Sequence, residues 1–459
     1  MDAKDKRIAE LEALLKAALE EIARLKERIA ALEKNSANSS KPPSSDIVKP
    51  SKQPKKKQKR KIGAQKGHKQ HLRQPFDEKQ IDKIVELKLN VCPVCSGKLK
   101  PTSEPPKKHQ HVELVDKPFI VTEFQQVRYW CEKCQCFHAA KLPLEVKKSG
   151  LFGPKLIALT AYLKGRGHMS YKTIQQFFND ALSLKMSTGF LTKQVRKASD
   201  TMEKPYQELV DQLPHEKHLH IDETGGKENG KKRWTWCFRA NALTVFHVDP
   251  SRGSVVLEKL LGKDYAGIIS CDFWGAYRKF DRLTDVALQF CWAHLIREVK
   301  FLAESKDKKI SRYGKRLLNS IREMFTTIHR KGELSDGNWL RRMRDHRELV
   351  LQTAWRRIPD VKDAINIAER LWNFQDDYFR FVETSIPPTN NLGEQSIRRV
   401  VIDRKVTQGT RSDWGNRWLE RFWSVLTTCE QRGTNVMSFL KSCIESCLHG
   451  LAPPSLVRK

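Results

Sequence analysis

The sequence lacks any long apolar run. None of its hydrophobic stretches approaches the roughly 18 residues that a membrane-spanning helix needs. Asp2, Lys4 and Asp5 lead directly into a charged, heptad-patterned segment, so we expect no signal peptide. These absences exclude an integral membrane protein and argue against secretion.

Acidic residues are also scarce relative to basic ones. Asp and Glu number 54 against 85 Lys and Arg, which gives a net charge of +31 in 459 residues. A chain this basic attracts phosphate backbones, so nucleic acid is the first expected partner. The hydrophobic fraction of 39% is enough for packed cores, and domains of about 150 residues would number about three.

The cysteines do not suit a disulfide framework, because the chain is large and their number, 11, is odd. Cys92 and Cys95 form one CxxC pair, and Cys131 and Cys134 form another. Two such pairs predict a structural Zn²⁺ site with four thiolate ligands in a zinc-ribbon-like domain over residues 85–148. Strand-like sequence at 112–115 and 119–121 lies between the pairs. Two further residues could replace Cys134 as a ligand, namely Cys136 and His138.

Residues 1–34 carry a heptad repeat, with Ile8 and Ile22 at a positions and Leu11 and Leu25 at d positions. This pattern predicts a coiled coil and a homodimer or higher homo-oligomer, rather than a helix packed on its own domain. The composition of residues 35–84 is typical of a basic Pro/Ser/Lys-rich linker, with no acidic residue from 47 to 76. We expect this linker to hold DNA phosphates without reading sequence.

Residues 150–205 show two amphipathic helical patterns. Ser187 can cap the second helix, whose apolar positions include Leu191 and Val195. The pair resembles a helix-turn-helix, although two such helices also occur in ordinary helical domains. The residues that we expect to face DNA are Lys193, Gln194, Arg196 and Lys197.

Residues 206–430 alternate between strand and helix patterns. Strands are expected at 218–222, 234–238, 243–248, 267–271 and 286–291, with a helix at 254–261. This order suits a mixed α/β sheet of the ribonuclease-H type, interrupted by a helical insertion at about 300–385. A C-terminal helical tail would follow at 431–459. The fold class expected for the whole chain is therefore multidomain α+β.

Asp222 and Asp272 each follow an expected strand, so both can reach one edge of the sheet. Together with Glu394 they could hold two Mg²⁺ ions. Two structural readings compete with this one. Asp222 could cap a turn, and Glu394 could form a helix capping box with Asn391.

Several motifs occur in an order that resembles the insertion sequence 66 family of bacterial transposases. The resemblance covers nearly the whole length and includes the leucine-zipper start and the CxxC…CxxC domain. Its other motifs lie at residues 38–46, Gly63 to His68, His220 to Thr224, Asp272 to Tyr277, Cys291 to His294, and 390–398.

The resemblance implies a DDE-type transposase that uses Mg²⁺ (or Mn²⁺) and acts on double-stranded DNA, at both the element ends and the target. It assigns catalysis to Asp222, Asp272 and Glu394. His294 could orient a metal-bound water or a phosphate, although a satisfied core histidine is the commoner situation. A bacterial, cytoplasmic, nucleoid-associated protein is expected, with accessory proteins conceivable.

Arginines near these motifs are candidates for holding the scissile phosphate, although solvated helix faces explain them too; they are Arg297, Arg398 and Arg399. Trp292 could stack on a base, but packing is the better default. Two other functions stay open: a DNA-binding regulator that has lost catalysis, and a hydrolytic nuclease without strand transfer.

Overall fold

The computed structural model describes residues 3–34, 75–89, 93–98, 106–115, 117–284 and 286–457. The chain divides into two units, one of residues 1–50 with 125–459 and one of residues 51–124. Most of the predicted basic linker lies outside the described residues, and so does Cys92. Among the described helices, none combines the length and the hydropathy that a membrane span requires.

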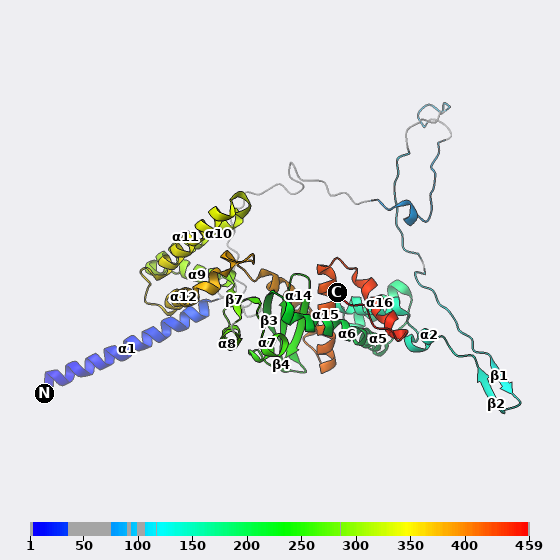
Figure 1. Cartoon of the computed structure of the whole chain (residues 1–459), viewed down its shortest axis with the longest axis horizontal. Helices are drawn as coiled ribbons and strands as arrows, with labels where there is room; N and C mark the ends of the chain where they lie inside the picture. The colour runs from blue at the N-terminus through cyan, green and yellow to red at the C-terminus, as the bar shows by residue number, and fades with distance from the viewer. Residues whose placement is uncertain are drawn as a thin grey trace. The chain divides into compact units, whose positions relative to one another are not determined.

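A five-stranded sheet forms the centre of the larger unit (Figure 1). Its strand order is β5-β4-β3-β6-β7, with β3, β4 and β5 antiparallel and β3, β6 and β7 parallel. The strands are β3 (His218–Glu228), β4 (Lys231–Arg239), β5 (Thr244–Asp249), β6 (Ile268–Cys271) and β7 (Ala287–Phe290). The strand pattern of the sequence predicted all five, and the mixed α+β class is confirmed.

One strand is longer than predicted. We expected the first strand to end at Asp222, but β3 continues to Glu228 because it pairs with β4 from His220 to Glu228. Asp222 therefore lies inside an antiparallel pair, opposite Cys237, rather than after a strand.

Helix α15 (Asp413–Gln431) covers the edge strand β5. The backbone N–H groups of Thr244, Phe246 and Val248 donate to the side chains of Thr428, Ser424 and Glu420 at 3.1, 2.8 and 2.7 Å. Every second residue of the strand thus meets every fourth residue of the helix, because four helical residues rise about 6 Å and two strand residues about 6.8 Å. These backbone N–H groups of the edge strand are therefore hydrogen-bonded without another strand.

Helix α7 (Val255–Leu261) connects β5 to β6, and α8 (Gly275–Thr284) connects β6 to β7. Helix α14 (Asn391–Thr407) follows later in the chain. Helix α14 packs on β3 and β4. The large aromatic side chains of Trp236, Phe246 and Tyr277 are fully buried in the core that these elements share.

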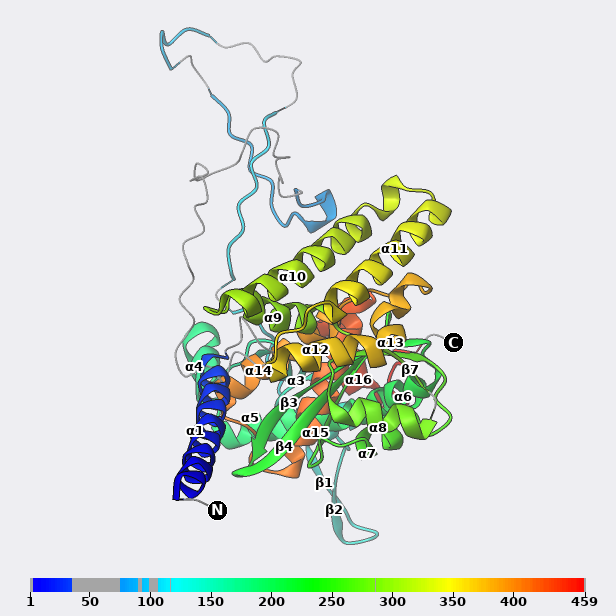
Figure 2. The same ribbon diagram turned by 90° about the vertical axis from the view of Figure 1, so that its left-hand side faces the viewer.

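A helical segment separates β7 from α14, as predicted. It contains α9 (Trp292–Ala303), α10 (Lys308–His329), α11 (Asp336–Trp355), α12 (Lys362–Asn373) and α13 (Gln375–Phe379). Helices α10 and α11 lie side by side (Figure 2). Gly314 allows α10 to approach α9, since a Cβ there would lie 2.3 Å from the Ala303 nitrogen.

The predicted helix pair before the sheet is present. It lies among α2 (Leu144–Ser149), α3 (Pro154–Gly165), α4 (Tyr171–Leu182), α5 (Thr188–Thr201) and α6 (Glu203–Gln212). The hydroxyl of Ser187 accepts from the Phe190 N–H and caps α5, as expected. The C-terminal segment differs from a tail, because α16 (Val436–Leu448) packs on α3 and α5.

The remaining elements are short, apart from the long helix α1 (Ala3–Glu33). A hairpin of β1 (Arg128–Cys131) and β2 (Cys136–Ala139) forms a separate two-stranded sheet. Single 3₁₀ turns occur at η2 (Glu78–Gln80), η3 (Leu213–His215), η4 (Lys331–Glu333) and η5 (Arg380–Val382). The strands predicted at 112–115 and 119–121 are wrong; these segments are extended but pair with no described strand.

Candidate catalytic site

Two of the predicted acids lie at the same end of neighbouring parallel strands, Asp222 on β3 and Asp272 directly after β6. The register pairs His220 of β3 with Ser270 of β6, and two further residues along each strand bring Asp222 level with Asp272. Neighbouring strands lie about 4.8 Å apart, so the two carboxylates share one edge of the parallel part of the sheet. Both residues are half-buried.

Asn390 brings the third acid to this edge. Its side-chain amide donates to the Ile221 carbonyl at 2.7 Å, and its backbone N–H donates to Cys291 Sγ at 3.1 Å. Its Oδ1 lies 3.0 Å from His220 Nδ1. Asn390 is 2% exposed, so these contacts fix the start of α14 directly beside Asp222.

Glu394 lies in the first turn of α14, and its carboxylate faces the side chains of Arg297 and His294 rather than the helix end. Arg297 Nη2 lies 3.3 Å from Glu394 Oε2, and His294 Nδ1 lies 3.5 Å from Oε1. The capping-box alternative is wrong, because the helix begins after Asn390 and no side chain caps it. The Cys291 thiol, the His294 ring and the Glu394 carboxylate lie within 4.8 Å of one another.

Burial and neighbouring carboxylates both raise the pKa of the two aspartates. Burial raises the pKa of Asp222 well above its ordinary value, and the charges of Glu223, Asp272 and Glu394 raise it further. Burial, Glu223 and Glu394 raise the pKa of Asp272 to about 7, while Arg252 opposes them. This edge of the sheet therefore favours a counter-charge when its acids are ionised.

The prediction missed the structural role of Glu223. Its side chain is 1% exposed and accepts from Arg252 Nε at 2.8 Å and from the Tyr277 hydroxyl at 2.6 Å. Neighbouring residues of a strand point to opposite faces, so Glu223 turns away from Asp222. Its charge still raises the pKa of both Asp222 and Asp272.

A comparison with family models gives the context of this geometry. The model described as the transposase IS66 family matches residues 149–417, more than half of the chain. The chain belongs to the IS66 transposase family. Residues 2–74 match a family of unknown function (DUF6444). No curated protein matches the sequence closely enough to count as a relative.

We call the end of the sheet that carries Asp222 and Asp272, together with Glu394, the acidic edge. All three residues lie within the region that matches the family. Arg398, also inside it, is exposed on α14, whereas Arg399 pairs with Glu430. Trp292 is fully buried and its Nε1 donates to the Tyr378 carbonyl at 2.6 Å, so its role is packing.

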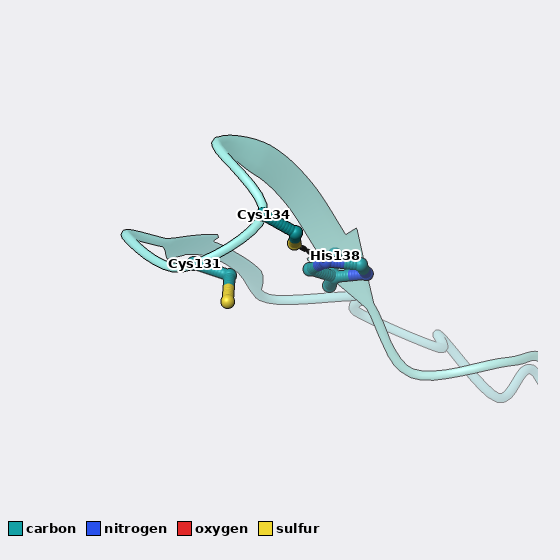
Figure 3. Close-up of side chains that lie close together, drawn as sticks. All are labelled: Cys131, Cys134 and His138. Atoms are coloured by element: carbon teal, nitrogen blue, oxygen red, sulfur yellow. Dashed lines mark hydrogen bonds between the residues drawn. The ribbon is translucent and has the colours of Figure 1, made fainter.

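The cysteine hairpin of the transposase offers three metal ligands. Cys131 ends β1, Cys134 lies in the turn that follows, and His138 lies on β2 with its ring toward Cys134 (Figure 3). The three ligand atoms lie within 4.8 Å of one another, and Cys134 Sγ is 3.1 Å from His138 Nε2. Backbone N–H groups of the turn lower the pKa of the Cys131 thiol, chiefly that of Cys134.

The other predicted zinc ligands are not part of this group of three. Cys92 lies outside the described residues, and Cys95 belongs to the smaller unit. The Cys136 thiol donates to the Cys134 carbonyl, so it does not take part in the group of three ligands. The four-cysteine set stays a prediction, and His138 is a ligand candidate beside Cys134 rather than in its place.

Helix α5 presents only part of the predicted DNA-facing set. Lys193 and Arg196 are exposed, and the Arg196 guanidinium lies over the Trp414 ring at 5.3 Å. The prediction for Gln194 is wrong: it is 4% exposed, because α3 and α16 both pack on α5. Lys197 donates to backbone carbonyls of residues 148 and 149 at 2.8 and 3.0 Å.

Proposed function

We propose that the transposase binds the terminal inverted repeats of its insertion sequence, cleaves DNA beside the terminal 3′-hydroxyl and transfers that hydroxyl to target DNA. Catalysis would occur in a ribonuclease-H-like DDE core at Asp222, Asp272 and Glu394. The observation that carries the proposal is the placement of these three carboxylates: β3 and β6 are parallel neighbours, Asn390 ties the start of α14 to β3, and the charges of Asp272 and Glu394 both raise the pKa of Asp222.

The donor set fits Mg²⁺ or Mn²⁺. These cations prefer oxygen ligands, and three half-buried carboxylates on one edge supply them. Burial, and then the charges of neighbouring acids, raise the pKa of both Asp222 and Asp272, so their ionised forms are disfavoured, and a divalent cation would relieve this. When bound, two such ions activate the attacking oxygen and stabilise the leaving oxygen of the phosphodiester.

Other residues of the chain hold the carboxylates in place. Arg297 and His294 orient Glu394, and Asn390 ties its helix to the strand of Asp222. Burial and the nearby Arg297 lower the pKa of His294, so its ring is neutral near pH 7 and could accept a proton. Arg252 pairs with Glu223 and offsets part of the negative charge near Asp272.

DNA binding and assembly belong to the same proposal. The exposed Lys193 and Arg196 on α5 would contact DNA within a helix-turn-helix, and the basic linker would add contacts to phosphate. A zinc ion on Cys131, Cys134 and His138 would stiffen the hairpin. Helix α1 would join copies of the chain through its exposed Ile and Leu side chains.

Substitutions of the three acids test catalysis. Asp222→Asn, Asp272→Asn and Glu394→Gln keep side-chain size but lose charge, so the fold and DNA binding should survive. Cleavage and strand transfer on labelled duplexes carrying the element ends should fall by several orders of magnitude in each, because such a site works as a unit. Asp264→Asn, a change at an exposed acid, should leave both reactions intact.

The same assays separate the rival functions. Normal cleavage by all three variants would refute the mechanism. A wild type that binds the ends but never cleaves them in Mg²⁺ or Mn²⁺ would be a regulator. A wild type that cleaves but joins no 3′-end to target DNA would be a nuclease.

A further inference from the structure

A cavity of about 410 Å³ lies beside the acidic edge. Most of its walls come from β3, the C-terminal half of α14, residues 409–412 and the start of α15, and residues of α3, α4, β4 and β5 complete the lining. Thr224 and Gly226 of β3 line it, and they point to the same face of the strand as Asp222. Two residues of a strand span about 7 Å, so the cavity begins one such step from the catalytic carboxylate.

The loop that closes the cavity is held to the end of β3. The Thr410 N–H donates to the Lys227 carbonyl at 2.9 Å, and the Asn229 N–H donates to the Thr410 carbonyl at 2.8 Å. Gly409 has a φ of +94°, and a Cβ there would lie 2.3 Å from the Lys227 carbonyl oxygen. The wall is thus a built part of the fold.

The cavity is lined by more cations than acids, and one of the cations has no acidic partner in the described part of the chain. Arg404 is half-buried and donates to the Thr224 hydroxyl at 3.0 Å, but no carboxylate among the described residues pairs with it. Burial alone lowers its pKa, which is what a guanidinium without a counter-ion should show. The other lining cations are Lys164, Lys227, Arg233 and Arg411.

The one acid in the lining does not oppose them. Asp403 lies 3.3 Å from His168 Nδ1, and the charge of Lys164 acts on it as well. Arg233 does have a carboxylate partner, Glu228 at 2.7 Å, but that acid is not part of the lining. The cavity therefore suits an anion, with Arg404 as its principal donor.

Aromatic side chains form the rest of the wall. Tyr171, Trp414 and Trp418 line the cavity together with apolar residues. The indole N–H of Trp414 is buried and has no acceptor among the described residues. Cations beside aromatic faces are what single-stranded nucleic acid requires, because phosphates pair with the former and bases stack on the latter.

We propose that this cavity binds one unpaired nucleotide of the DNA strand next to the cleaved bond. Its base would lie against Trp414 and Tyr171, and its phosphate against Arg404. The volume lies within the range of small-molecule sites, about 300–1,000 Å³, so a nucleotide fits while a duplex does not. The nucleotide must therefore leave the base stack. This inference rests on the proposed function, since it needs DNA at the acidic edge.

Photo-crosslinking of the full chain tests the proposal. Duplexes carrying an element end would contain 5-iodouracil in place of thymine at successive positions around the cleaved bond, with Ca²⁺ to allow binding with little turnover. Light joins this base to an aromatic ring on which it stacks. We expect one position to crosslink to the peptide of Trp414 or Tyr171, and Trp414→Ala to reduce the yield about 10-fold. Trp355→Ala, at an exposed tryptophan of α11, should leave the yield unchanged.

A second measurement does not depend on an aromatic substitution. A mismatch at the crosslinking position lowers the cost of unpairing, so the wild type should bind the mismatched duplex more tightly than the matched one. Arg404→Ala should abolish this preference, and Lys405→Ala, which removes a charge from an exposed neighbouring position, should keep it.

The outcomes separate the two proposals. Crosslinks that map elsewhere at every position, in a protein that cleaves the same duplex, would overturn the cavity proposal and leave the proposed function standing. Crosslinks in the cavity of a protein that never cleaves would do the reverse. A mismatch preference that survives Arg404→Ala would refute the role of Arg404.

Discussion

Asp272 shows how the acidic edge affects the stability of the protein. Its pKa is raised from 3.8 to about 7, chiefly by burial and by Glu223. Between these values the folded chain holds a proton that the unfolded chain has lost. Folding stability must therefore fall as the pH rises through this window, and the loss is complete above pH 7.

This fall in stability with rising pH can be tested on the metal-free protein. In the presence of EDTA, the thermal unfolding midpoint should fall from pH 5 to pH 8. Asp272→Asn should flatten the fall and raise the midpoint at pH 8 by a few degrees, about 2–4 °C for each kcal/mol. Mg²⁺ should raise the wild-type midpoint at pH 8 but not that of the variant.

Asp264→Asn is the matched control and should keep the wild-type dependence on pH, because its side chain is exposed. An Asp272→Asn protein with the wild-type slope would show that another group titrates in this window.

Asn390 is the residue on which the geometry of the third acid depends. Asn390→Ala removes the bonds to the Ile221 carbonyl and to His220, and leaves buried polar groups unpaired. We expect a loss of about 1–3 kcal/mol in the free energy of unfolding, measured by urea denaturation. Cleavage should fall more than DNA binding does, because Glu394 is no longer held beside Asp222.

The neighbouring Asn391→Ala serves as the control, since Asn391 is exposed and its side chain accepts no capping bond. Equal effects of the two substitutions would mean that the helix start, rather than the Asn390 amide, positions Glu394.

At the same scale, the sequence could indicate which residues carry the chemistry but not how each is held. The acids follow apolar strand sequence, so a shared sheet edge was a reasonable prediction for Asp222 and Asp272. Nothing local distinguishes Glu223 as the partner of Arg252 and Tyr277, which lie 29 and 54 residues away. Gln194 looked exposed because the prediction considered two helices, whereas α16 arrives from the end of the chain.

At the scale of elements, the β1–β2 hairpin gives a test of metal binding. Purified protein should contain about one zinc per chain, as a structural site does. Cys131→Ser and His138→Ala should each reduce the zinc content measured by elemental analysis, because both remove atoms of the three-ligand group. Cys136→Ser should retain the metal, since its thiol already donates to the Cys134 carbonyl.

Loss of zinc from Cys136→Ser but not from His138→Ala would mean that Cys136, rather than His138, is a zinc ligand. Zinc that persists in Cys131→Ser would place the metal elsewhere.

The elements also show where pattern reading ends. Alternating apolar residues located β4 and β5 well, but the same pattern at 112–115 found no pairing strand. A strand exists only when a neighbour satisfies its backbone, and the sequence does not name that neighbour. The cover of β5 by α15 is a similar case, because Glu420, Ser424 and Thr428 look like any polar positions of a helix until β5 lies against them.

At the scale of the whole molecule, helix α1 presents an apolar stripe that the other described residues leave exposed. Ile8, Leu15 and Leu25 are 55, 61 and 46% exposed, and all three lie on the heptad seam. Burying such a stripe against a second copy removes apolar surface from water, which favours association. Two copies would also bring two active sites together, one for each element end.

The last prediction follows from this stripe. Leu15→Asp introduces a charge at the centre of the seam and should shift the protein toward monomer in light scattering, because a buried carboxylate in an apolar interface is strongly unfavourable. Ala13→Asp introduces the same charge on the same helix turn, outside the seam, and should leave the mass unchanged. If assembly serves to pair the ends, Leu15→Asp should reduce the joining of two ends to one target more than it reduces cleavage of a single end. A protein that keeps its mass after Leu15→Asp associates through another surface. Equal losses of joining and cleavage would mean that assembly does not serve to pair the ends.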